Sequence, residues 1–245
     1  MILLFILFFY GCIVSVFFLG PRGIPTQPPP EVANVSPDPA PAKEPELSLD
    51  QTEARRIFEK GEKLMRQAKW AAAGKLFQRA TELDPQFQPA YVRLGQALYR
   101  QGKYDDSIEM LTRATRIKDE FESNFYLGLA YKAKGAWKPA GDSFIQAIKL
   151  NKDQADSRLG DAYYFLGEAL KHTGQLKLTI DDLEASVRNN TITPMQRFQL
   201  ATLCLWAGDD YLAAQHRNVL TKDDENLADQ LQRLMQLHQK GHKSS

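Results

Sequence analysis

Two ladders of evenly spaced glycines constrain the fold of this 245-residue chain more than any other feature. One ladder has intervals of 33, 39 and 34 residues and consists of Gly102, Gly135, Gly174 and Gly208. The other runs ahead of it at 34, 33 and 39 residues and consists of Gly61, Gly95, Gly128 and Gly167. Self-similarity at about 34 residues is typical of stacked helical hairpins. The sequence therefore predicts an all-α solenoid, an architecture that usually holds partners.

The helical pattern begins after Ser48, which forms a potential capping box with Gln51 three positions later. In the first hairpin, Gly61 and Ala73 are small residues on facing helices, and Phe77 lies four positions after Ala73 on the same side. We expect the small residues to let the two helices approach closely. A small residue followed two positions later by a bulky one marks each turn, namely Ala68/Trp70, Gly102/Tyr104 and Gly135/Trp137.

These positions resemble the tetratricopeptide repeat family. The resemblance rests on typed positions that recur in order, namely Ala73, Phe77, Ala80, Pro85, Leu94-Gly95 and Tyr131. It is strongest over 54–154 and predicts five units, about 54–87, 88–120, 121–154, 160–193 and 194–224. The last two units diverge, because an insertion lies near 151–160 and Arg217 replaces a large apolar residue. The resemblance implies a right-handed superhelix whose first helices line a concave groove.

The C-terminal segment predicts a capping helix over about 224–240. Leu227, Leu231 and Leu234 form an apolar stripe, which either Leu237 or His238 extends. The opposite side of the helix is polar, as the outer face of a terminal unit must be. The predicted repeat domain therefore spans 48–245 and ends in this helix.

Residues 1–20 carry no charge, and a helix of that length spans roughly 30 Å, the thickness of a bilayer core. We expect a single-pass transmembrane anchor, in a bacterial inner membrane. A cleaved signal peptide fits less well, because a basic start and a small-residue cleavage site are missing. A lipoprotein signal also fits less well, because the apolar run continues past Cys12.

Residues 21–47 hold nine of the thirteen prolines and predict a disordered linker that lifts the repeat domain off the membrane. The side of the membrane stays open. Arg22 favours the cytoplasm by the positive-inside rule, whereas a long proline-rich spacer favours the outer face.

The family resemblance also implies the residues of a partner groove. The position three residues before each unit's small residue holds Phe58, Val92, Phe125, Tyr164 and Phe198. Neighbouring groove positions include Glu62, Gln96, Tyr99, Leu129, Lys132 and Lys171. An aromatic stripe on a solvent-facing concave surface favours a partner helix or extended peptide. The alternative is that the rings pack between adjacent first helices. The lysines and asparagines of a carboxylate clamp are missing from these positions, which argues against that subclass.

Charge and motifs argue against several functions. The chain has 31 basic and 30 acidic residues without a basic stripe, so nucleic acid is not an expected partner. No phosphate loop, His-Glu-x-x-His or Gly-x-Ser-x-Gly motif is present, and the four histidines lack metal-ligand spacing. We therefore expect no catalytic residues, metal or cofactor.

The sequence predicts a membrane-anchored scaffold or adaptor that binds a protein segment and supports assembly of a membrane-associated complex. Two alternatives stay open. One is a transient assembly factor that holds an immature client, as a co-chaperone does. The other is a self-associating platform, in which the groove takes a helix of a second copy.

Overall fold

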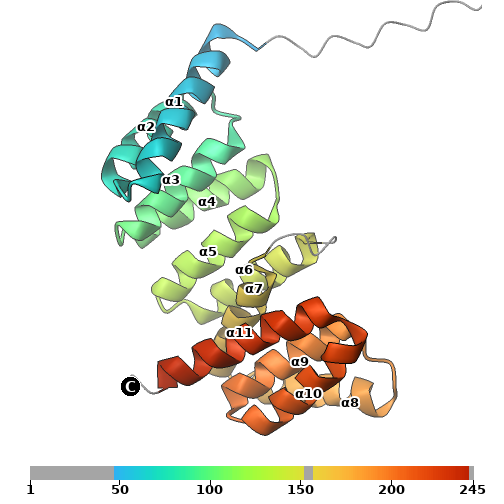
Figure 1. The fold of residues 1–245 in the computed structure, drawn as a ribbon. Helices are drawn as coiled ribbons and strands as arrows, with labels where there is room; N and C mark the ends of the chain where they lie inside the picture. The colour runs from blue at the N-terminus through green and yellow to red at the C-terminus, as the bar shows by residue number, and fades with distance from the viewer. Residues whose placement is uncertain (1–46, 152–156, 243–245) are drawn as a thin grey trace, which may run out of the picture. The chain divides into compact units, whose positions relative to one another are not determined.

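The computed structural model describes residues 47–151 and 157–242, which form eleven α-helices and no strand (Figure 1). The predicted anchor and nearly all of the predicted linker lie outside the described residues. The helices are α1 Leu49–Arg66, α2 Trp70–Leu83, α3 Gln88–Arg100, α4 Tyr104–Ile117, α5 Phe121–Ala133, α6 Trp137–Leu150, α7 Leu159–His172, α8 Leu176–Arg188, α9 Pro194–Ala207, α10 Asp210–Asp223 and α11 Glu225–His242. The prediction of an all-helical repeat fold is confirmed.

Local signals place the helix ends. The capping box at Ser48 is confirmed, since the Gln51 backbone N–H donates to Ser48 Oγ over 3.1 Å and the Ser48 backbone N–H donates to Gln51 Oε1 over 3.0 Å. All four glycines of the later ladder have positive φ, between 73° and 84°. Ala68 occupies the equivalent turn of the first unit with φ of 55°, where an alanine is strained.

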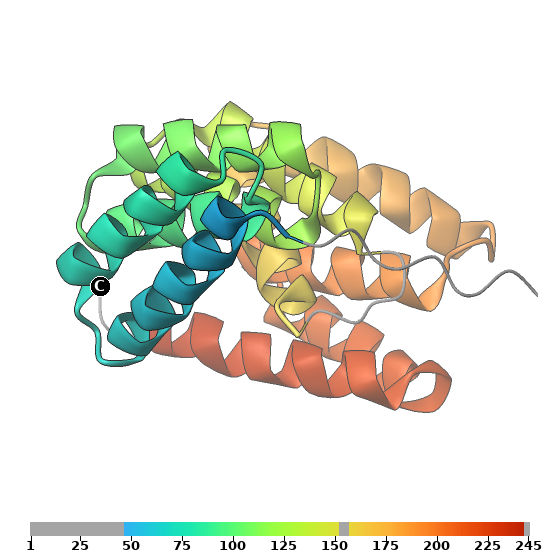
Figure 2. The same cartoon turned by 90° about the horizontal axis from the view of Figure 1, so that it is seen from above.

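Units one to three are antiparallel helix pairs, α1/α2, α3/α4 and α5/α6, which stack on one another (Figures 1 and 2). A glycine on each first helix accepts a large side chain from the second helix. A Cβ added at Gly61 would lie 2.6 Å from Phe77, and one at Gly128 would lie 2.6 Å from Phe144. The expected close approach at Gly61 is confirmed, and the contact recurs in the third unit.

The fourth unit departs from this arrangement. Helix α7 contacts α9 more extensively than it contacts α8. A Cβ at Gly167 would meet Trp206 of α9 at 2.5 Å, so α9 supplies the large side chain that the second helix supplies in the earlier units. Helix α8 buries only Leu176 and Leu183 among its residues and leaves Leu178 65% exposed. The divergence predicted here is thus a change of helix partner.

The predicted capping helix is α11, which packs against α7, α9 and α10 (Figure 1). Its apolar stripe runs from Leu227 through Leu231 and Leu234 and continues with His238, which is 4% exposed. Leu237 is 57% exposed and points away from the core. The stripe ends on the histidine because that ring finds partners on α7 and α9.

Candidate functional site

The first helices of the units form one continuous face, here called the first-helix face and made by α1, α3, α5, α7 and α9. Helix α3 contacts α5, and α7 contacts α9, whereas successive second helices among α2, α4, α6, α8 and α10 make no comparable contact. At α3/α5 and α7/α9 the first helices therefore approach each other more closely than the second helices do. A partner segment bound on the side of the first helices would contact this face.

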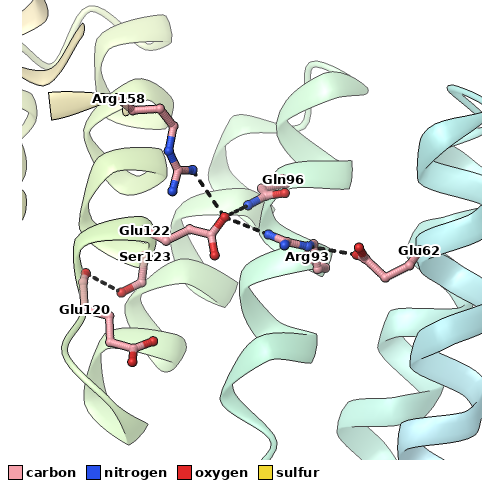
Figure 3. A network of polar contacts seen from close by, with 7 residues as sticks. All are labelled: Glu62, Arg93, Gln96, Glu120, Glu122, Ser123 and Arg158. Carbon is pink, nitrogen blue, oxygen red and sulfur yellow. Dashed lines mark hydrogen bonds and ion pairs between the residues drawn. The ribbon is translucent and has the colours of Figure 1, made fainter. Parts of the chain in front are cut away.

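A ladder of charged groups crosses this face from α1 to the start of α7 (Figure 3). Arg93 Nε donates to Glu62 Oε1, and Arg93 Nη1 donates to Glu122 Oε1, both over 2.8 Å. Glu122 Oε1 also accepts from Arg158 Nη1 at 3.2 Å and from Gln96 Nε2 at 3.3 Å. The charged side chains of the ladder therefore satisfy one another across four units.

The ladder is partly shielded from water, and this affects its ionisation. Burial alone would raise the pKa of the Glu122 carboxyl, but the hydrogen bond from Arg93 and the charges of Arg93 and Arg158 outweigh it and hold that pKa below its ordinary value. The same partners raise the pKa of Arg93 against the opposing effect of burial. Glu122 and Arg93 thus stay charged at neutral pH.

Most of the predicted aromatic stripe is buried, which corrects the expectation of a solvent-facing stripe. Val92 is 2% exposed, Phe125 4% and Phe198 0%. Gln96, at a neighbouring predicted position, is 6% exposed. The Phe125 ring packs against Phe165 of α7 and Phe144 of α6, and the Phe198 ring packs against Tyr163 of α7. Phe58 is partly buried and packs against Phe77 and Phe87, at ring-centroid distances of 5.4 and 5.1 Å.

Helix α11 covers the first-helix face over α7 and α9. Tyr164 Oη and His238 Nδ1 form a hydrogen bond of 2.9 Å, and the His238 ring lies against Trp206 at 5.2 Å. Leu234 of α11 and the Phe198 ring both lie 3.6 Å from the Cβ position of Gly160. The predicted groove residue Tyr164 therefore contacts the chain's own terminal helix.

The remaining predicted groove residues lie nearer the turns. Lys132 pairs with Glu168 at 3.1 Å and lies 5.0 Å from the Phe165 ring centroid. Tyr99 and Leu129 are partly buried. Lys171 is exposed and lies 5.7 Å from the Trp206 ring centroid.

The open part of the face lies over α1, α3 and α5, where a hollow of about 320 Å³ is found. Its lining combines apolar, aromatic and charged side chains and consists of Glu62, Met65, Arg66, Trp70, Arg93, Gln96, Arg100, Glu122 and Tyr126. Six of these residues were not predicted from the sequence, namely Arg66, Trp70, Arg93, Arg100, Glu122 and Tyr126. A usable signal was present, since Arg66 and Arg100 each stand five residues after a ladder glycine.

Other reactive groups lie away from this hollow. Burial, followed by the charges of Asp209 and Glu184, raises the pKa of the Cys204 thiol to about 12, and the side chain is 1% exposed. Within residues 47–151 and 157–242 no three His, Cys, Asp or Glu side chains are placed to hold a metal ion. None of the helices described there has the length and apolar composition needed to cross a membrane.

Comparison with known proteins supports the family resemblance for part of the chain. Residues 64–128 match the family model described as Tetratricopeptide repeat, a segment that runs from the end of α1 through α2, α3 and α4 into α5. A search of curated proteins found no match. The tetratricopeptide repeat family is thus supported by the matched segment and by the fold.

Solved structures show the same fold at low sequence identity. A crystal structure of a variant of Podosopora anserina putative kinesin light chain nearly identical TPR-like repeats is 15% identical with a TM-score of 0.51. It covers 74% of this chain and 100% of its own. A second structure of these repeats is 14% identical, with a TM-score of 0.50 and coverages of 75% and 95%. At such identities the similarity shows the fold alone.

Proposed function

We propose that this chain is a protein-binding scaffold, and that the open part of its first-helix face, over α1, α3 and α5, holds a segment of a partner protein. The proposal rests on a difference between the two ends of the first-helix face. The chain's own α11 covers α7 and α9, whereas the hollow of about 320 Å³ over α1, α3 and α5 is uncovered.

The composition of this hollow fits a protein segment. Its lining includes Met65, Trp70 and Tyr126 as apolar surface, and charged groups surround them. Protein interfaces are enriched in tryptophan, tyrosine, methionine and arginine at their centres. An extended or helical segment that crosses neighbouring first helices would contact several units at once, as solenoid surfaces allow.

We further propose that residues 1–20 anchor the chain in a membrane and that residues 21–47 act as a spacer. The uncharged apolar run and the proline content support this part of the proposal. In this arrangement the scaffold is confined near the membrane, and its role is to support assembly of a membrane-associated complex, in a bacterial inner membrane.

Site-specific photo-crosslinking tests the binding face. A photoreactive amino acid replaces Met65, which lines the hollow, or Ile145, an exposed residue on the second helix α6, in the full chain expressed in its native membranes. We expect Met65 to crosslink one protein reproducibly and Ile145 to leave that protein uncaptured. Equal capture at both positions would refute the proposed face. Capture of a second copy of this chain would instead support a self-associating platform.

A further inference from the structure

Four cations gather where units one and two make their turns. Arg66 ends α1 and Arg100 ends α3, whereas Lys69 and Lys103 precede α2 and α4. None of the four forms an ion pair with a carboxylate of the described residues. The balanced charge of the whole chain conceals this local excess.

Some basic residues near these turns do have acidic partners. Arg93 bonds two glutamates in the ladder, and Lys132 pairs with Glu168. In the third unit Lys134 pairs with Asp105, and Lys138 lies 3.6 Å from Asp142. The turns of units one and two thus bring four cations without carboxylate partners among the described residues around one pair of adjoining hollows.

Helix dipoles explain only half of this cluster. The C-terminal ends of α1 and α3 carry partial negative charge, which favours Arg66 and Arg100 there. Lys69 and Lys103 stand at the N-caps of α2 and α4, where the partial charge is positive. Neither lysine forms a side-chain cap hydrogen bond, and serine, threonine, aspartate or asparagine is the usual N-cap residue. Local helix stability therefore gives no reason for these two lysines.

One aromatic side chain, Trp70, lies among these cations. The Arg100 guanidinium lies 5.7 Å from the Trp70 ring centroid. Both residues line the hollow on the first-helix face, and both also line a second, open hollow of about 680 Å³ at the turns, with Lys69 and Lys103. The two hollows thus meet at Trp70 and Arg100. A ligand that crosses this point would contact apolar surface with unpaired cations on both sides.

We infer that this junction selects a partner segment in which acidic residues flank a large apolar side chain. The carboxylates would pair with the four cations, and the apolar side chain would lie against Trp70 and Met65. The inference rests on the proposed function and specifies the chemistry of its partner. It places the anionic contacts on Arg66, Lys69, Arg100 and Lys103, at the turns of units one and two.

Designed peptides test this chemistry on the full chain in detergent. One fluorescent 12-residue peptide has aspartate and glutamate around a central phenylalanine, a second has asparagine and glutamine instead, and a single-stranded oligonucleotide of equal charge serves as a third probe. Anisotropy measures binding to the native chain, to Arg66→Gln/Arg100→Gln, and to Lys75→Gln/Arg116→Gln. The last variant is a control with the same loss of charge at exposed sites on α2 and α4.

We expect the acidic peptide to bind more tightly than the amide peptide and the oligonucleotide, with an affinity that falls as salt rises. Replacement of Arg66 and Arg100 should weaken binding of the acidic peptide by a factor of about 3 to 30. The control variant should bind that peptide as tightly as the native chain does. Equal binding of the two peptides, or equal losses in both variants, would overturn the inference. Tighter binding of the oligonucleotide would show a general polyanion site and overturn it too. If Met65 still crosslinks one protein in any of these cases, the proposed function stands and only the partner chemistry is wrong.

Discussion

The contact between Gly128 and Phe144 gives the sharpest test of how the repeats pack. In Gly128→Ala, the new Cβ would lie 2.6 Å from Phe144 Cε1 and 2.8 Å from Cδ1 and Cζ. These distances are well inside ordinary van der Waals contact. The Phe144 ring is fully buried, and the rings of Phe125 and Phe165 hold it at centroid distances of 6.0 and 5.8 Å. Movement of the ring would therefore disturb these neighbouring rings.

The expected magnitude combines two opposing effects. Alanine in a helix interior is favoured over glycine by about 1 kcal/mol. Overpacking of a buried site costs about 1–3 kcal/mol, and three ring atoms in contact place this substitution near the upper end. We therefore expect Gly128→Ala to lower the free energy of unfolding by about 1–2 kcal/mol. The melting temperature should fall by about 2–8 °C.

Gly141→Ala is the matched control. Gly141 is also a buried helical glycine, but its added Cβ would lie 3.5 Å from the Ala169 Cβ, an ordinary contact. This variant should gain about 0.4–1 kcal/mol. Urea unfolding followed by circular dichroism measures both variants. If Gly128→Ala proves as stable as Gly141→Ala, the packing described for unit three is wrong.

Three further outcomes follow from the described contacts. Phe125→Ala together with Phe198→Ala should unfold the helices around them, because truncating each buried ring costs about 3–5 kcal/mol; retained native helicity by circular dichroism would contradict their core role. The pKa of Glu122 is lowered in the fold, so its contribution is complete above its unfolded value of about 4.3 and is lost as pH falls through the folded value. Urea titrations at several pH values should thus show a smaller acid loss of stability for Glu122→Gln than for the native chain, and equal losses would refute the assignment. With its pKa near 12, Cys204 in a Cys12→Ser background should react with iodoacetamide at pH 8 far more slowly than in urea, and equal rates would contradict the packing of α9.

The repeat fold was predictable because its signals are local and recur. The glycine ladders, the capping box at Ser48 and the Ala73/Phe77 pattern each specify a helix end or a helix pair. The change of partner in the fourth unit was not predictable in detail. Helix α8 offers few large apolar residues, but only the packed structure shows that Trp206 of α9 takes the place beside Gly167. This change of helix partner depends on the contact between Gly167 and Trp206, which are 39 positions apart in the sequence.

The candidate site was predicted less well than the fold. A period of about 34 residues identifies equivalent positions, but it does not fix the rotation of each helix within a fraction of a turn. Phe125 and Phe198 therefore face the seam between helices rather than the groove. Coverage of Tyr164 by α11 could not be inferred, because it depends on how the terminal helix crosses α7 and α9. That Arg66 and Arg100 have no acidic partner among the described residues can be recognised only from the structure, which shows the ion pairs of the surrounding side chains.

Hydrogen exchange with and without the protein captured through Met65 tests where the partner binds. We expect binding to slow exchange in residues 62–70 and 93–104 and to leave α7, α9 and α11 unchanged, because α11 already covers that part of the face. Slower exchange in α7 and α9 together with faster exchange in α11 would show that the partner displaces the terminal helix. That result would contradict the account.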